Sequence, residues 1–124
     1  MIEVSVVVLT YFHEEYIDKA IRSVLSQDTD YNYEIIVSDD NSKDRTIKIL
    51  QNIKEENPDI IRIIHHKENV GTTKNLYEAL ISAKGKYITL LSGDDYYCND
   101  KKIKIQRVIH FNYTPRGDKA TASL

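Results

Sequence analysis

The chain alternates between short apolar runs and longer stretches in which apolar residues recur every three or four positions. Short runs rich in valine and isoleucine are typical of strands that are buried on both faces of a sheet. Spacings of three and four place apolar side chains on one face of a helix. The runs that predict strands are Glu3–Thr10, Tyr33–Ser38, Ile60–His65 and Tyr87–Leu91.

Helices are expected between these strands and after the last one. The first opens at Glu14 or Glu15, where negative charge suits the helix dipole. Asp44 is placed to cap the second, and Gly85 to follow the end of the third. A last helix is expected over Lys101–Phe111. The residues expected to face inward are Ile17, Ala20, Ile21, Val24 and Leu25, then Ile47, Leu50 and Ile53, then Leu76, Ala79, Leu80 and Ala83, and finally Ile105, Val108 and Ile109.

Alternating strands and helices predict an α/β fold, with a mostly parallel sheet, helices on both of its faces and right-handed connections. A chain of 124 residues is long enough for one domain with a real core, here expected over residues 1–111. The apolar pattern stops at Asn112, so residues 112–124 are expected to form a frayed or disordered tail.

Composition narrows the class of protein. Hydrophobic residues are 41%, charged residues are 29% and the net charge is −2, so no basic face predicts a nucleic-acid partner. The one cysteine, Cys98, excludes an internal disulfide and fits a reducing, cytoplasmic setting, where it is expected to be a small semi-buried filler. The run Val4–Leu9 is too short to cross a membrane and lacks the features of a signal peptide.

Polar residues follow each predicted strand, and the carboxyl ends of parallel strands share the edge of the sheet where ligands bind. Four separate loops are therefore expected to converge on one ligand. The residues in question are Thr10 and Tyr11, Asp39 and Asp40, Asn69 to Gly71, and Asp94 and Asp95.

Each of these features has two interpretations. Asp94 and Asp95 would repel each other unless a cation such as Mg²⁺ or Mn²⁺ lay between them, or they form a solvated turn. Asp39 and Asp40 can accept hydrogen bonds from a base or a ribose, or they cap a helix. Tyr11 can stack on a base or pack on the rim of the first helix.

Other candidates for ligand binding are weaker. Gly71 and the start of the third helix offer N–H groups to an anion, whereas Lys74 can serve a phosphate or be a solvated lysine. No glycine-rich phosphate loop is present. His65 and His66 are interpreted as residues at the end of a strand.

Four pieces of the chain together resemble one known family. They are Val4 to Tyr11 (VSVVVLTY), Asp39 to Thr46 (DDNSKDRT), Asn69 to Gly71 (NVG) and Ser92 to Asp95 (SGDD). Over about residues 2–111 the chain resembles the inverting family-two glycosyltransferases with the GT-A fold, whose first half is a Rossmann-like nucleotide-binding unit. The resemblance implies transfer of a sugar from a nucleoside diphosphate sugar, UDP-linked, to an acceptor hydroxyl, with Mn²⁺ or Mg²⁺ on the diphosphate.

The resemblance also implies roles for individual residues. The nucleotide-binding residues are Thr10 and Tyr11 around the base, Glu15 near the nucleotide, Asp40 reading the base with Asp39 beside it, Lys74 in the pocket and Asp94 at the ribose. Asp95 is the implied metal ligand. Two positions depart from the family pattern, which often has Asp at Ser92 and Asn at Phe12.

The acceptor half of such an enzyme is not recognisable in this sequence. That half supplies the general base, which is expected beyond residue 124, so the chain is expected to be a truncated fragment that binds the donor without completing transfer. By resemblance, the acceptor is a glycan or a lipid-linked glycan of bacterial polysaccharide assembly. The longer protein would associate peripherally with the inner face of the membrane, and its oligomeric state stays open.

Two alternatives belong to other functional classes. A receiver-type signalling domain is also a parallel α/β unit that binds Mg²⁺ through acidic residues. It requires an acidic pair after the first strand and an aspartate after the third, where this chain has Thr10-Tyr11 and His65-His66. A nucleotide-sugar-binding module without chemistry is the other alternative.

Overall fold

The computed structural model describes residues 1–97, 109–112 and 121–123. The elements along the chain are β1 (Val4–Thr10), α1 (Ile17–Leu25), β2 (Tyr33–Asp39), α2 (Thr46–Glu56), β3 (Ile61–His65), α3 (Thr72–Ser82), β4 (Tyr87–Ser92), β5 (Ile109–Asn112) and β6 (Thr121–Ser123). The predicted alternation of strands and helices is confirmed from β1 to β4.

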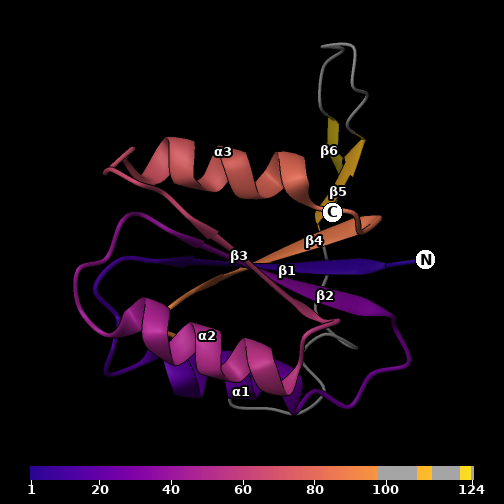
Figure 1. Ribbon diagram of the computed structural model, residues 1–124. Coiled ribbons are helices and arrows are strands. Elements are labelled where there is room, and N and C mark those ends of the chain that lie inside the picture. The colour runs from indigo at the N-terminus through magenta and orange to yellow at the C-terminus, as the bar shows by residue number, and fades with distance from the viewer. Residues whose placement is uncertain (98–108, 113–120, 124) are drawn as a thin grey trace.

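One sheet contains all these strands, in the order β3-β2-β1-β4-β5-β6. β1 pairs in parallel with β2 on one side and with β4 on the other, and β5 and β6 extend the sheet in antiparallel fashion. Figure 1 shows α1 and α2 on one face of the sheet and α3 on the other. The predicted mostly parallel sheet with helices on both faces is therefore confirmed.

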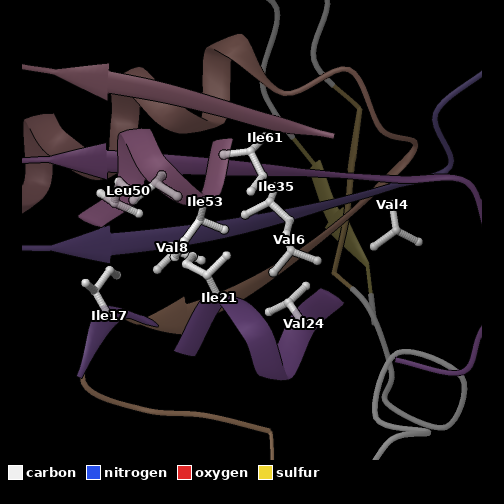
Figure 2. Packing of buried hydrophobic residues seen from close by; sticks show 11 residues of the cluster. Val4, Val6, Val8, Ile17, Ile21, Val24, Ile35, Leu50, Ile53 and Ile61 are labelled. Carbon is white, nitrogen blue, oxygen red and sulfur yellow. The ribbon is translucent and has the colours of Figure 1, made fainter. Parts of the chain in front are cut away.

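The central strand β1 is buried on both faces, which explains its run of valines. Val4, Val6 and Val8 pack with apolar residues of α1 and α2, as Figure 2 shows. Val7 points to the opposite face, where Ala79 of α3 belongs to the same cluster. Because β1 is held between two cores, its carboxyl end is a fixed platform for the loop that follows.

The predicted start of the first helix is wrong by two or three residues. Glu14 and Glu15 lie in a turn, and α1 begins at Ile17, whose N–H and that of Tyr16 both donate to the carbonyl of His13. Glu14 instead serves the next helix, because its carboxylate accepts the N–H of Arg45 at 3.0 Å.

The start of the second helix is close to the prediction. α2 begins at Thr46 with Arg45 as its N-cap residue, so Asp44 lies one position too early to be the cap. The Asp44 carboxylate nevertheless accepts both the N–H of Thr46 at 3.0 Å and its hydroxyl at 2.6 Å. An acidic residue thus satisfies a free N–H at this helix end, as expected.

Gly85 has a different role from the one predicted. α3 ends at Ser82 with Ala83 as its C-cap residue, so Gly85 lies beyond the position that ends a helix. A Cβ atom on Gly85 would lie 2.6 Å from the backbone nitrogen of Ser5 and 2.8 Å from the carbonyl carbon of Val4. Glycine is needed here because the chain passes close to β1.

β4 is not covered on both faces as predicted. Ile88 and Thr89 are buried, but the Leu90 side chain is 43% exposed. The reason is that α3 packs over β1 and β2, which leaves this face of the carboxyl end of β4 open.

The predicted last helix is wrong at Ile109–Phe111, which belong to β5, and residues 101–108 lie outside the described residues. In the region predicted to be a frayed tail, Asn112 ends β5 and Thr121–Ser123 form β6, while the rest of the tail also lies outside the described residues. In the part of the chain that the structure describes, no helix has the length and apolarity needed to cross a membrane.

Candidate functional site

A pocket of about 340 Å³ opens at the carboxyl ends of β1 and β4. These two strands flank the point where the strand order reverses, because the connections through α1 and α2 run to one side of β1 and that through α3 to the other. Such a switch point is where α/β sheets bind their ligands. The lining residues are Leu9, Thr10, Tyr11, His13, Asp40, Thr72, Asn75, Leu90, Leu91 and Ser92.

Thr10 and Tyr11 form the wall of the pocket at the end of β1. The carbonyl of Thr10 accepts the N–H of Asp40 at 3.1 Å, and its hydroxyl lies 3.0 Å from Nδ1 of His13. Tyr11 is 46% exposed, and its ring meets that of Phe12 edge to face, with centroids 4.5 Å apart. The structure thus brings together a fixed threonine and an aromatic ring available for stacking.

Asp40 joins the pocket to the loop before α3. Its carboxylate accepts the N–H groups of Val70 at 2.7 Å and Gly71 at 3.2 Å, and its side chain is almost buried. The N–H of Gly71, predicted to bind an anion, is therefore already engaged. Because each carboxylate oxygen has two lone pairs, Asp40 retains acceptor capacity toward the pocket.

Asp39, in contrast, belongs to the turn after β2. It is fully buried, and its carboxylate accepts the N–H and the hydroxyl of Ser42, at 2.8 and 2.5 Å. Nε2 of His65 lies 3.7 Å from it. The two interpretations of the acidic pair thus divide between its members: Asp39 organises a turn, and Asp40 lines the pocket.

Asp94 and Asp95 leave the end of β4 in an exposed loop. The hydroxyl of Ser92 donates to Asp94 at 2.5 Å, and this hydrogen bond lowers the pKa of the Asp94 carboxyl. The N–H of Asp95 donates to the carbonyl of Ser92 at 2.9 Å. Among the described residues, no hydrogen bond or ion pair engages the Asp95 carboxylate, so it is available to a ligand.

Gly93 places this acidic loop beside the loop after β1. Its N–H donates to the carbonyl of Leu9 at 2.8 Å. A Cβ atom on Gly93 would lie 2.6 Å from Nδ1 of His13 and 2.9 Å from the Thr10 side chain. Both acidic elements, Asp40 and the Asp94-Asp95 pair, are therefore packed around the same end of β1.

Of the acidic loop only Ser92 lines the pocket, and Asp94 and Asp95 are exposed beside it. Two further predicted residues, Glu15 and Lys74, are exposed and do not line the pocket either. Glu15 lies in the turn before α1, and Lys74 lies in the first turn of α3. The described residues also contain no group of three or more histidine, cysteine or acidic side chains that could hold a metal ion.

Several lining residues were missed by the sequence analysis, and His13 and Asn75 are two polar ones among them. His13 lies in the predicted loop after β1, but nothing in the sequence indicated that it faces Thr10. Asn75 is buried, and it exchanges hydrogen bonds with Ser38 of β2, at 2.6 and 3.0 Å. The sequence could have indicated the importance of Asn75, because this amide occupies a core-facing position of α3, one turn before Ala79.

Comparisons with known proteins identify the family of this chain. Residues 5–114 match the family model described as Glycosyl transferase family 2. The Escherichia coli protein named UDP-Glc:alpha-D-GlcNAc-diphosphoundecaprenol beta-1,3-glucosyltransferase WfaP is 38% identical over 115 residues, which cover 91% of this chain and 42% of that protein. The chain spans between 30% and 42% of the length of such curated relatives.

Two solved structures resemble the fold closely. S. aureus TarS in complex with UDP has a TM-score of 0.74 and 31% identity, covering 83% of this chain and 30% of that chain. The mannosyltransferase PcManGT from Pyrobaculum calidifontis, in complex with GDP-Man and Mn²⁺, has a TM-score of 0.75 and 25% identity, covering 82% of this chain and 30% of that chain. From the family match and these GT-A neighbours, we conclude that the chain belongs to glycosyl transferase family 2.

Proposed function

We propose that the pocket between β1 and β4 binds a nucleoside diphosphate sugar, with UDP as the nucleotide. The observation that carries this proposal is the meeting of Thr10, Tyr11, Asp40 and the Ser92–Asp95 loop at one edge of the sheet. These groups come from three separate loops. The exposed aromatic ring suits stacking on a base, and the nearly buried carboxylate suits the N–H group of that base. The two exposed carboxylates suit the ribose and the diphosphate.

In this proposal each residue has a distinct role. Tyr11 stacks on the uracil, and Asp40 accepts the N–H of the base with the lone pairs that Val70 and Gly71 leave free. Asp94, whose pKa is lowered by the hydrogen bond from Ser92, accepts hydrogen bonds from the ribose hydroxyls. Glu15 and Lys74 are proposed to meet parts of the donor that extend beyond the pocket.

The residues present fit a divalent ion. Asp95 is an exposed carboxylate without a competing partner among the described residues, and it would hold Mn²⁺ or Mg²⁺. Because one carboxylate is too few for such an ion, its other oxygen ligands would come from the diphosphate and water. When bound, the ion offsets the charge that develops on the departing diphosphate.

For the whole protein, we propose transfer with inversion to a hydroxyl of a glycan or a lipid-linked glycan, on the cytoplasmic side of the membrane. By its name, the E. coli relative acts on a lipid-linked acceptor, and TarS was solved with UDP and PcManGT with GDP-Man and Mn²⁺. The general base is proposed to lie outside residues 1–124. The family match leaves no role for a receiver-type signalling domain.

Calorimetry with UDP and Mn²⁺ tests the proposal on the wild type and on Asp95→Asn. We expect the variant to lose about tenfold to a hundredfold in affinity for UDP in the presence of Mn²⁺, because a contact to a charged group contributes about 1.5–3 kcal/mol. Without the metal the two proteins should bind UDP alike. GDP in place of UDP tests the choice of base.

Asp59→Asn is the matched control, because it removes one exposed carboxylate from the opposite edge of the sheet, just before β3. It should bind like the wild type. Equal affinity of the wild type and Asp95→Asn would contradict the metal assignment. Failure of the wild type to bind any nucleoside diphosphate would contradict the donor site itself.

A further inference from the structure

The two residues that follow the acidic pair are tied to α1, a helix that does not line the pocket. The N–H of Tyr97 donates to the hydroxyl oxygen of Ser23 at 2.9 Å. Nζ of Lys19 lies 3.7 Å from the centroid of the Tyr96 ring, a cation–π contact. Two successive loop residues are therefore fastened to two successive turns of one helix.

The Ser23 hydroxyl both donates and accepts a hydrogen bond in this arrangement. It donates to the carbonyl of Ala20 at 2.6 Å, and its oxygen accepts the N–H of Tyr97. A serine inside a helix is neutral or slightly unfavourable when it bonds only to its own helix. Here the contact to the loop gives the hydroxyl a second function, since it connects the helix backbone to the loop backbone.

The side chain of Tyr97 also anchors the end of the loop. Its ring packs against the core cluster shared by β1, α1 and α2, and its hydroxyl lies 3.4 Å from the hydroxyl of Thr89 in β4. Tyr97 is thus anchored through both its backbone and its side chain.

The acidic loop is consequently fixed at both ends. At its start, Gly93 donates to Leu9 at 2.8 Å and Asp95 donates to Ser92 at 2.9 Å. At its end, Tyr97 is held by Ser23. The exposed carboxylates of Asp94 and Asp95 lie between these two anchors. A short segment fixed at both ends has few conformations to lose when a ligand binds.

We infer that Ser23 is a positioning residue for Asp94 and Asp95, with Lys19 as a weaker second contact, and that α1 thereby sets the affinity of the pocket for a metal–diphosphate group. This inference rests on the proposed function. It assigns a role in donor binding to a helix whose sequence shows only an apolar stripe and a polar face.

Ser23→Ala tests the inference, with Ser26→Ala as a matched control. Ser26 makes the same kind of bond, from its hydroxyl to the carbonyl of Arg22 at 2.6 Å, but no contact to the acidic loop is among its described hydrogen bonds. Affinity for Mn²⁺ in the presence of UDP is measured by the electron paramagnetic resonance signal of free Mn²⁺. Hydrogen exchange of the Tyr97 amide reports the contact itself.

We expect Ser23→Ala to bind Mn²⁺ about tenfold more weakly in the presence of UDP, the upper end for one hydrogen bond. Its Tyr97 amide should exchange faster, and its affinity for UDP alone should stay within about twofold of that of the wild type. Ser23→Thr, which keeps the hydroxyl, should restore the Mn²⁺ affinity. Ser26→Ala should match the wild type in every measurement.

Lys19→Met provides a second variant that keeps the long side chain and removes the charge above Tyr96. It should weaken Mn²⁺ binding about twofold to fivefold, and it decides the question if Ser23→Ala does not fold. Unchanged Mn²⁺ affinity in both variants, with a wild type that binds, would overturn the inference and leave the proposed function intact. A wild type that binds no Mn²⁺ with UDP would overturn both.

Discussion

Carboxylates at the amino ends of the parallel strands (the amino edge of the sheet) differ in burial and in partners from those at the carboxyl ends (the carboxyl edge). At the amino edge, Glu34 of β2 is 3% exposed and accepts hydrogen bonds from the hydroxyl of Ser5 and the N–H of Lys84, each at 2.7 Å. It also accepts two from Arg62, at 3.1 and 2.8 Å. At the carboxyl edge, Asp94 and Asp95 are exposed, and only Asp94 has a described partner, Ser92.

The difference shows what a carboxylate contributes in each place. Glu34 connects β1, β2, β3 and the loop before β4, and with all its partners inside the protein it has no capacity left for a ligand. The acidic pair connects no elements through its side chains, so its charge is available to something that binds. Burial and partners, rather than residue type, therefore separate structural carboxylates from candidate ligands.

The largest expected effect is a loss of stability when the buried carboxylate at the amino edge is removed. Glu34→Ala should lower the free energy of unfolding by about 3 kcal/mol, because it removes one member of a mostly buried ion pair and leaves several donors without an acceptor. Urea unfolding measures the change. Wherever the variant remains folded, its affinity for UDP with Mn²⁺ should match that of the wild type.

Asp18→Ala is the control for this prediction. Asp18 pairs with Arg22 on the surface of α1 at 3.0 Å, and both side chains are about half exposed. Loss of such a pair changes stability little, because water screens it. A loss of stability in Asp18→Ala as large as that in Glu34→Ala would show that burial does not distinguish the two carboxylates.

Two glycines, one at each edge, give a sharper comparison of intermediate size. Gly85→Ala and Gly93→Ala each introduce a methyl group within 3.0 Å of other atoms, so each should lose about 1–3 kcal/mol of stability in thermal or urea unfolding. Only Gly93→Ala should also weaken binding of UDP, because it pushes the loops after β1 and β4 apart. Equal binding defects in the two variants would contradict the assignment of the pocket to one edge.

The smallest expected effect concerns the charge of the acidic loop. Ser92→Ala should raise the pKa of Asp94 toward its ordinary value of 3.8, because the hydroxyl that stabilises the carboxylate is lost. A carboxyl with a lowered pKa contributes stability that is present above its unfolded pKa and is lost as the pH falls through its folded pKa. The variant should therefore lose less stability on acidification. An NMR titration of the Asp94 carboxyl measures the shift, and an unchanged pKa would contradict the role of Ser92.

The sequence was sufficient for the fold wherever one local pattern decided the outcome. Apolar runs and helical spacings predicted β1 to β4 and the three helices between them, since each pattern reflects burial of one short segment. Features that depend on distant residues were not predictable. Leu90 is exposed because α3 lies over other strands, and Gly85 is needed because of Ser5, eighty positions earlier in the chain.

The candidate site was predicted in part for the same reason. Strand ends located Thr10, Tyr11 and Asp40 correctly at one edge, but the burial of Asp39 and the approach of His13 depend on packing. Phe12 illustrates the limit. Its φ of +55° is a left-handed conformation, which asparagine tolerates better than phenylalanine. Asparagine is the residue that the family often has at this position, but only the structure reveals the backbone conformation.

The pairing of β1 has a consequence for how the chain folds. Val4 pairs with Tyr33 of β2 on one side and with Tyr87 of β4 on the other. The pairing of β1 is therefore complete only when β4, its partner more distant in sequence, has joined the sheet. Until β4 arrives, a valine-rich strand has an open edge that a second chain could join. Folding of this sheet should accordingly be slow and prone to association at high concentration, and early capture of β4 should be the step that prevents it.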